Sequence, residues 1–241
     1  FLMAAGLDAP KRVYAHGWWT NEGEKISKSL GNVISPYDLV ERYGLDPVRY
    51  FLMREVPFGN DGDFSHISMV NRSNGELAND LGNLAQRVLS MVAKNCDGAV
   101  PGHGDFNADD AKMLDFARNL IASVRTDMDR QAFNQVLEDI WLAIRMANGY
   151  VDAQAPWKLK KEDPDRMGTV LYVLTEVIRH IALLLQPFMP DSMARMLDQL
   201  AVSPEHRDFA FLGDAHRLIP GTALPPPEGV FPRYVDEENA G

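Results

Sequence analysis

The sequence is nearly free of cysteine, since Cys96 is the only thiol among 241 residues. A single thiol excludes an internal disulfide and any zinc site built from several cysteines. We therefore expect Cys96 to be a small residue near the end of a helix, and we expect no metal site in this chain.

Long apolar runs are also missing. No stretch of the sequence approaches the roughly 20 apolar residues that a membrane-spanning helix requires. Residues 1–6 are apolar but lack the charged start of a signal peptide. With the lack of disulfides, these features predict a cytoplasmic protein. Position 1 is Phe rather than an initiator Met, so we expect the chain to begin inside a domain.

The chain has no excess of basic charge. Lys and Arg number 24 against 34 acidic residues, which gives a net charge of −10. Nonspecific nucleic-acid binding depends on a broadly basic surface, so the composition argues against it. Residues 1–60 are balanced in charge, which leaves room for a local polyanion site.

Residues 1–65 alternate between extended stretches, glycine-rich turns and short helices. An extended segment is expected at residues 12–15, and helices at residues 36–43 and 47–55. Ser35 and Asp46 are the expected N-caps, and each precedes a proline at the first helical position. This alternation predicts the end of an α/β domain.

Residues 66–203 repeat apolar side chains at the spacing of amphipathic helices. The repeating positions are Leu77, Leu81, Leu84, Val88 and Met91; Met113, Phe116, Leu120 and Val124; Val136, Ile140, Ile144 and Ala147; and Leu171, Leu174, Ile178, Ile181 and Leu185. Loops are expected at residues 97–105 and 160–165, and a short helix at residues 191–200. The pattern predicts a mainly α fold, an antiparallel helical bundle that follows the α/β segment.

Residues 204–241 are poor in periodicity and rich in proline. We expect an irregular C-terminal tail that packs over other elements or is partly mobile.

The most informative stretch is residues 23–32, GEKISKSLGN. Glycines let a loop bend and approach a ligand closely. Serine hydroxyls and backbone N–H groups can bind phosphate oxygens, while Lys25 and Lys28 each add a mobile positive charge. These properties suit phosphoryl chemistry, which depends on positioning and electrostatic stabilisation. The alternative is a solvated surface turn.

Asn83 and Arg87 form a polar ridge on the first long helix. At about 100° per residue they lie on the face opposite Leu77, Leu81 and Leu84, one turn from each other. Such a pair can hydrogen-bond the edges of unstacked RNA bases. The alternative is two ordinary surface residues.

Trp157 follows Pro156, which is expected to stop the preceding helix. An aromatic ring held in this way can offer a stacking platform for a base. The alternative is a tryptophan that plugs the end of the bundle.

Asp61 and Asp63 lie two residues apart in a glycine-rich turn, a spacing that can bind hard cations. No third acid lies nearby, so we interpret them as turn and cap residues.

The KISKS sequence of residues 25–29, followed by Leu-Gly-Asn, resembles the KMSKS motif of class I aminoacyl-tRNA synthetases. The resemblance implies that Lys28 contacts the ATP phosphates and stabilises the transition state of adenylation, with help from Lys25. The ATP-binding residues that it implies are Lys25, Ile26, Ser27, Lys28 and Ser29, with Asn32 also shaping the loop. ATP with Mg²⁺ would be a substrate, and residues 1–65 would end a Rossmann-type catalytic domain.

Residues 13–18 and 50–65 resemble methionyl-tRNA synthetases, and the similarity continues to Arg233. In that family an Asn-x-x-x-Arg pair and a Trp after Ala-Pro read the CAU anticodon of tRNA-Met, and Asn83, Arg87 and Trp157 match these positions. The resemblance implies that residues 1–65 include a stem-contact segment and that residues 66–203 form an anticodon-binding domain. Residues 204–241 would be a tail that packs back across the molecule.

The implied activity is methionine–tRNA ligase, with methionine bound by an N-terminal half that this chain lacks together with a HIGH-type motif. Alone, the chain is expected to bind tRNA weakly and to make no aminoacyl-adenylate. No dimerisation module is evident after Arg233, which favours a monomer. The alternatives are a non-enzymatic tRNA-binding module and a helical scaffold with no RNA role.

Overall fold

The computed structural model describes residues 1–57 and 59–235, so the last six residues of the expected tail lie outside the described part. A small sheet near the N-terminus has the strand order β2-β1-β3. Its strands are β1 (Trp19–Asn21), β2 (Glu24–Lys25) and β3 (Gly62–Phe64). β1 is antiparallel to β2 and parallel to β3. The extended segment expected at residues 12–15 is not a strand, because strand pairing begins only at Trp19.

The turn between β1 and β2 has left-handed backbone at two successive positions, Glu22 (φ 51°) and Gly23 (φ 80°). Two-residue hairpins use such turns because their twist matches that of the strands, and glycine takes positive φ at little cost. The hairpin therefore directs Lys25 into the following loop.

Three short helices follow: α1 (Pro36–Tyr43), α2 (Leu45–Arg54) and α3 (His66–Arg72). The predicted cap Ser35 is confirmed, since its Oγ accepts from the Asp38 N–H at 3.4 Å. The prediction that Asp46 caps α2 is wrong. Gly44, with φ 87°, precedes α2, and the buried Asp46 accepts instead from the backbone N–H of Ser192 at 2.6 Å.

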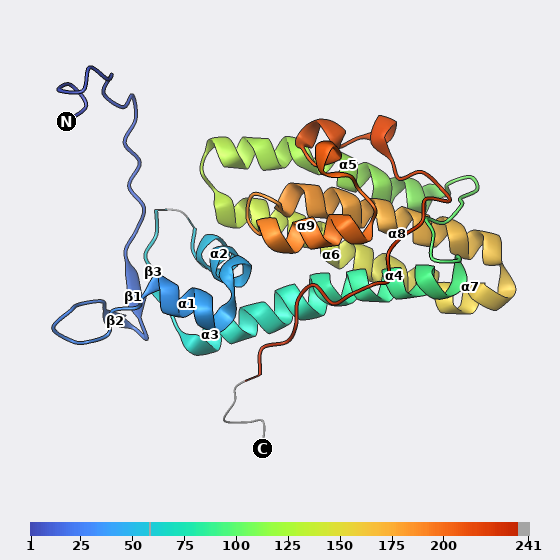
Figure 1. Ribbon diagram of the computed structural model, residues 1–241, viewed down its shortest axis with the longest axis horizontal. Helices are drawn as coiled ribbons and strands as arrows, with labels where there is room; N and C mark the ends of the chain where they lie inside the picture. Colours follow the sequence, from blue (N-terminus) through green and yellow to red (C-terminus); the bar gives the residue numbers. More distant parts are fainter. Residues whose placement is uncertain (58, 236–241) are drawn as a thin grey trace.

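A layered helical bundle forms the body of the molecule (Figure 1). Its long helices are α4 (Asn83–Asn95), α5 (Ala108–Asp129), α6 (Phe133–Gln154) and α8 (Pro164–Leu185), with the shorter α9 (Pro190–Gln199) at the end of the chain of helices. One continuous apolar cluster joins them, with Ile140, Ile144, Leu171 and Leu174 fully buried. The predicted mainly α fold is confirmed.

Between α3 and α4 the backbone is π-helical over Ser73–Gly82, labelled η1. A π-helix bonds i to i+5 and has wider turns, so a constant period of 3.6 residues is wrong for this segment. Leu77 and Leu81 are nevertheless buried. Asn83 begins α4, so the spacing of Asn83 and Arg87 is that of an α-helix.

The connection between α6 and α8 is more regular than expected. α6 ends at Gln154, Ala155 is left-handed (φ 45°, ψ 58°), and a further helix, α7 (Pro156–Glu162), follows at once. The loop predicted at residues 160–165 is wrong, because only Asp163 separates α7 from α8 and its side chain caps α8 through the Arg166 N–H at 3.0 Å.

Among the described residues, α8 alone is long and apolar enough to cross a membrane by length and composition. Of its most apolar 18-residue window, 94% is buried inside the bundle. The apolar character of α8 is thus that of a central core helix.

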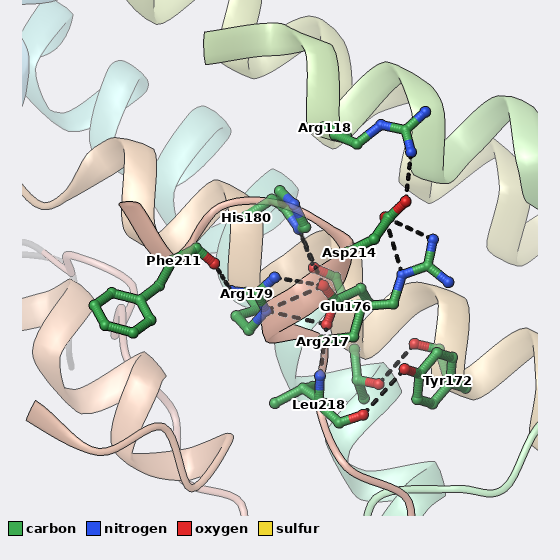
Figure 2. Close-up of polar contacts among 10 residues, drawn as sticks. Arg118, Tyr172, Glu176, Arg179, His180, Phe211, Asp214, Arg217 and Leu218 are labelled. Atoms are coloured by element: carbon green, nitrogen blue, oxygen red, sulfur yellow. Dashed lines mark hydrogen bonds and ion pairs between the residues drawn. The ribbon is translucent and has the colours of Figure 1, made fainter. Parts of the chain in front are cut away.

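Beyond α9 the chain crosses the bundle with three short 3₁₀ turns, Pro204–His206, Phe209–Phe211 and Asp214–His216. Figure 2 shows how it is held. The buried Glu176 carboxylate accepts from the Arg179 side chain and from the Leu218 N–H at 3.1 Å, while Arg179 donates to the Phe211 carbonyl at 2.7 Å. Further on, Tyr234 packs against Tyr43 of α1, with ring centroids 5.3 Å apart.

Candidate nucleic-acid interface and phosphate loop

The loop at residues 26–32 is closed by the side chain of Asn32. Its Oδ1 accepts from the Ser27 N–H at 2.8 Å, and its Nδ2 donates to the Lys25 carbonyl at 3.1 Å. The Asn21 amide in β1 also donates to the Asn32 carbonyl at 3.0 Å. One amide thus joins both ends of the loop, and a second ties the loop to the sheet.

Ser27 and Ser29 stabilise the loop by hydrogen bonds within it. Their hydroxyl oxygens lie 2.8 Å apart, and Ser27 Oγ accepts from the Leu30 N–H at 3.2 Å. Lys25 and Lys28 are exposed, whereas Ile26 is half-buried. The loop therefore presents two ammonium groups to solvent on a backbone that its own side chains hold.

The carboxylates of Asp61 and Asp63 accept hydrogen bonds from residues in and next to β1. Asp61 Oδ1 accepts from the Trp18 N–H at 2.8 Å, and Asp63 Oδ1 accepts from the Thr20 hydroxyl at 2.6 Å and the Gly23 N–H at 2.8 Å. Asp61 directly precedes β3, whereas Asp63 lies within β3, so the interpretation as a turn or cap residue is wrong for Asp63. Within the described part of the chain, no group of three or more His, Cys, Asp or Glu side chains is arranged to hold a metal ion.

A second site lies at the other end of the molecule, where α4 passes α6 and α7 (Figure 1). Asn83 is exposed on the first turn of α4, and Arg87 follows one turn later. Arg87 Nη2 lies 2.8 Å from Asp152 Oδ1 on α6, and its guanidinium carbon is 5.9 Å from the ring centroid of Trp157. Arg87 and Trp157, 70 positions apart in the printed sequence, therefore meet on one surface.

Trp157 lies just past the end of α6, as expected, and also in the first turn of α7, because the left-handed Ala155 ends α6 and the buried Pro156 starts the next helix. The indole is 47% exposed. A side chain exposed to this extent does not plug the bundle. It offers an aromatic face to solvent beside a cation, an arrangement suited to stacking with a base.

Sequence reasoning missed Asp152. Its carboxylate restrains Arg87 in front of Trp157, and the partners are 65 residues apart. An aspartate on an exposed helical face carries no local signal of such a pairing.

Comparison with known proteins now identifies the chain. A family model described as "tRNA synthetases class I (M)" matches residues 1–89, which include the small sheet and the loop at residues 26–32. A second, "Anticodon binding domain of methionyl tRNA ligase", matches residues 100–241. The chain belongs to the methionyl-tRNA synthetase family.

Individual relatives agree with this assignment. The chain is 53% identical over 240 residues to the methionine–tRNA ligase of Mesorhizobium japonicum, covering 100% of this chain and 46% of that protein. It is 56% identical over 241 residues to the methionine–tRNA ligase of Brucella suis, covering 99% of this chain and 47% of that protein. The chain is also similar to a solved structure, Mycobacterium tuberculosis methionyl-tRNA synthetase in complex with methionyl-adenylate. The TM-score is 0.91 at 53% identity, and the match covers 96% of this chain and 46% of that one. The chain thus spans about half the length of the relatives that it matches.

Proposed function

We propose that this chain supplies the ATP-phosphate loop and the anticodon reader of a methionine–tRNA ligase. The whole enzyme would activate methionine with MgATP and transfer it to tRNA-Met in the cytoplasm, acting as a monomer. Residues 1–65 would end the catalytic domain, residues 66–203 would bind the anticodon, and residues 204–241 would be the tail.

The convergence of Arg87 and Trp157 on one exposed surface is the observation that carries the proposal. A base of the CAU anticodon would stack on the indole, while Arg87 and Asn83 bond the edges of its neighbours. Asp152 lowers the conformational freedom of Arg87, so less entropy is lost when the guanidinium binds RNA.

In the loop, Lys28 would contact the ATP phosphates, and Lys25 would assist. Charge increases on the α-phosphate and on the departing pyrophosphate during adenylation, and two ammonium groups on a held loop stabilise that charge. Ile26, Ser27 and Ser29 would shape the loop; the partial burial of Ile26 and the hydrogen bonds of the two serines support this.

The anticodon assignment is tested by titrating this chain with a stem-loop RNA that carries CAU and with a matched RNA that carries another anticodon. Trp157→Ala should weaken binding of the CAU RNA by about 5- to 150-fold, because a base–aromatic stack contributes about 1–3 kcal/mol. Trp18→Ala is the matched control, since Trp18 is 80% exposed and precedes β1, at the opposite end of the molecule from α7.

An equal loss of affinity for both RNAs after Trp157→Ala would contradict anticodon reading. No change for either RNA would instead favour a helical scaffold with no RNA role.

The loop assignment is tested in the full-length ligase by pyrophosphate exchange. Lys28→Ala should lower the adenylation rate about 100-fold or more, the order of effect found when one transition-state donor is removed. The affinity for methionine should stay the same. A change confined to methionine affinity would count against the assignment.

A further inference from the structure

A largely buried polar network reaches the end of α6, just before the helix that carries Trp157. Asp110, at the start of α5, is fully buried, and its two carboxylate oxygens accept from Arg166 at 2.5 and 2.8 Å. Tyr150 of α6 donates its hydroxyl to the same carboxylate at 2.5 Å. One aspartate thus joins the start of α5, the last turns of α6 and the start of α8.

Arg166 extends this network to the last residue of α6. Its Nη2 donates to Gln154 Oε1 at 2.6 Å, and Gln154 Nε2 in turn donates to Asp109 at 3.4 Å. Gln154 immediately precedes the left-handed Ala155 and the helix that carries Trp157. Arg166 therefore links the chain on both sides of Trp157. It lies in the first turn of α8, nine residues after Trp157, and it bonds to Gln154, three residues before Trp157.

The charge state of the network suits this role. Burial alone would raise the pKa of Asp110, but hydrogen bonds from Arg166, Tyr150 and the Asn107 N–H outweigh it and hold that pKa below its ordinary value. The carboxylate is therefore ionised at neutral pH. Buried ion pairs are often no more stabilising than apolar residues of similar size, so a bidentate pair at this place contributes mainly defined geometry.

We propose that Gln154 is a positioning residue for anticodon reading: together with the Asp110–Arg166 pair it fixes the α6–α7 turn and so the orientation of the Trp157 ring. This inference rests on the proposed function, because it assumes that Trp157 stacks on a base.

Gln154→Ala is the variant of choice, since it detaches the end of α6 without removing either partner of the buried ion pair. Gln154→Glu is the rescue variant, because its carboxylate still accepts from Arg166. Gln135→Ala is the matched control, as Gln135 lies near the other end of α6 and its side chain bonds only to Asp139 among the contacts described, at 2.9 Å.

Binding of CAU and non-CAU stem-loop RNAs to this chain is measured for each variant, alone and combined with Trp157→Ala, together with the Tm. Gln154→Ala should lower the preference for CAU about fivefold, while its Tm stays close to that of Gln135→Ala. Gln154→Glu should restore the preference. In the Trp157→Ala background, Gln154→Ala should have no further effect, because coupled residues are not additive.

The ring itself is followed by ¹⁹F NMR after labelling with 5-fluorotryptophan, with the Trp157 signal assigned through Trp157→Phe. Gln154→Ala should shift or broaden that signal, and Gln135→Ala should leave it unchanged.

Three outcomes would overturn the inference. If Trp157→Ala abolishes the CAU preference but Gln154→Ala keeps it, only the positioning role is wrong. If Gln154→Ala lowers the preference for CAU RNA equally in the parent chain and in the Trp157→Ala background, again only the positioning role of Gln154 is wrong. If Trp157→Ala itself keeps the preference, the proposed function fails, and the inference fails with it.

Discussion

At the scale of single residues, Asn32 illustrates a side chain whose two ends have different roles. Its oxygen accepts from the Ser27 N–H and its nitrogen donates to the Lys25 carbonyl. Neither a carboxylate nor an aliphatic residue can do both. We infer that the amide, more than the serines, holds the two lysines at a fixed separation.

Asn32→Asp should test this in the full-length ligase. The carboxylate can still accept, but it cannot donate to the Lys25 carbonyl, and its charge would repel the phosphates of ATP bound as proposed. The kcat/KM for ATP in pyrophosphate exchange should fall at least tenfold, or about 1.4 kcal/mol, with the KM for methionine unchanged. Unaltered ATP kinetics would show that the loop does not depend on this amide.

His180 provides a prediction for pH. Its Nδ1 lies 2.9 Å from the Glu176 carbonyl oxygen, and its Nε2 is buried without a hydrogen-bond partner in the described part of the chain. Burial lowers the pKa of His180, and the positive charge of Arg179 lowers it further. The negative charge of Glu176 raises it, but the net shift is downward. The folded protein thus keeps this ring neutral at a pH where an unfolded histidine, with a pKa of about 6.5, gains a proton.

Because the unfolded state binds the extra proton, the free energy of unfolding should decrease as the pH falls below about 6.5. Urea unfolding at pH 7.5 and 5.5 should show this loss, and His180→Leu should show a smaller one. His206→Leu, at an exposed ring, is the control and should keep the loss seen in the parent chain. An identical pH dependence in the parent chain and His180→Leu would reject the assignment.

At the scale of elements, one nearly continuous helical path runs from α3 through the π-helical η1 into α4. It connects the sheet next to the KISKS loop with the helix that carries Asn83 and Arg87 (Figure 1). Polar side chains brace it from α2, where the Tyr50 hydroxyl and the Arg54 guanidinium both donate to the Glu76 carboxylate of η1. The two sites are therefore joined by packed, hydrogen-bonded structure.

Asp46 links two other elements, since it lies in α2 and accepts from the first turn of α9. Asp46→Ala should lower the free energy of unfolding by about 1–2 kcal/mol, the usual effect of losing a helix cap. Asp46→Asn should lose less, because its oxygen still accepts. Asp38→Ala on the exposed face of α1 is the control, with a change within about 0.5 kcal/mol.

Urea unfolding gives the free energy of unfolding of all three variants. Equal stabilities of Asp46→Ala and Asp38→Ala would show that the contact between α2 and α9 contributes nothing.

At the scale of the whole molecule, the tail is the element that spans the most structure. It is bound to α8 through Glu176 and Arg179, pairs with Ala99 through Ala223, and reaches α1 through Tyr234 (Figures 1 and 2). The carboxylate of Glu176 is fully buried, and its partner Arg179 is 2% exposed. Docking of the tail thus depends on a charged pair in the core.

Glu176→Gln should leave Arg179 buried without a counter-charge and lower the free energy of unfolding by about 3–5 kcal/mol. Limited proteolysis with mass spectrometry should then find early cleavage after residue 203. Arg118→Ala is the control, because its pair with Asp214 is solvent-accessible and contributes about 1 kcal/mol or less. A cleavage pattern like that of the parent chain would contradict this role for Glu176.

Local patterns predicted much of the fold. Apolar residues spaced three and four apart identified α5, α6 and α8, because a helix with one buried stripe must repeat at that interval. Ser35 was predicted as a cap because its bond closes within three residues. The same local reasoning failed for Asp46, whose partner lies 146 residues away, and for η1, where tertiary packing overrode the usual helical period.

The sequence by itself determined the helical class of the fold and predicted a phosphate-binding role for the KISKS loop, since both inferences depend on residues close together along the chain. Only the tertiary structure decided that Arg87, Asp152 and Trp157 share one surface and that Arg166 bonds to Gln154, three residues before Trp157. These contacts join separate helices, whose relative placement depends on how the whole core packs. No spacing within any single helix encodes that placement.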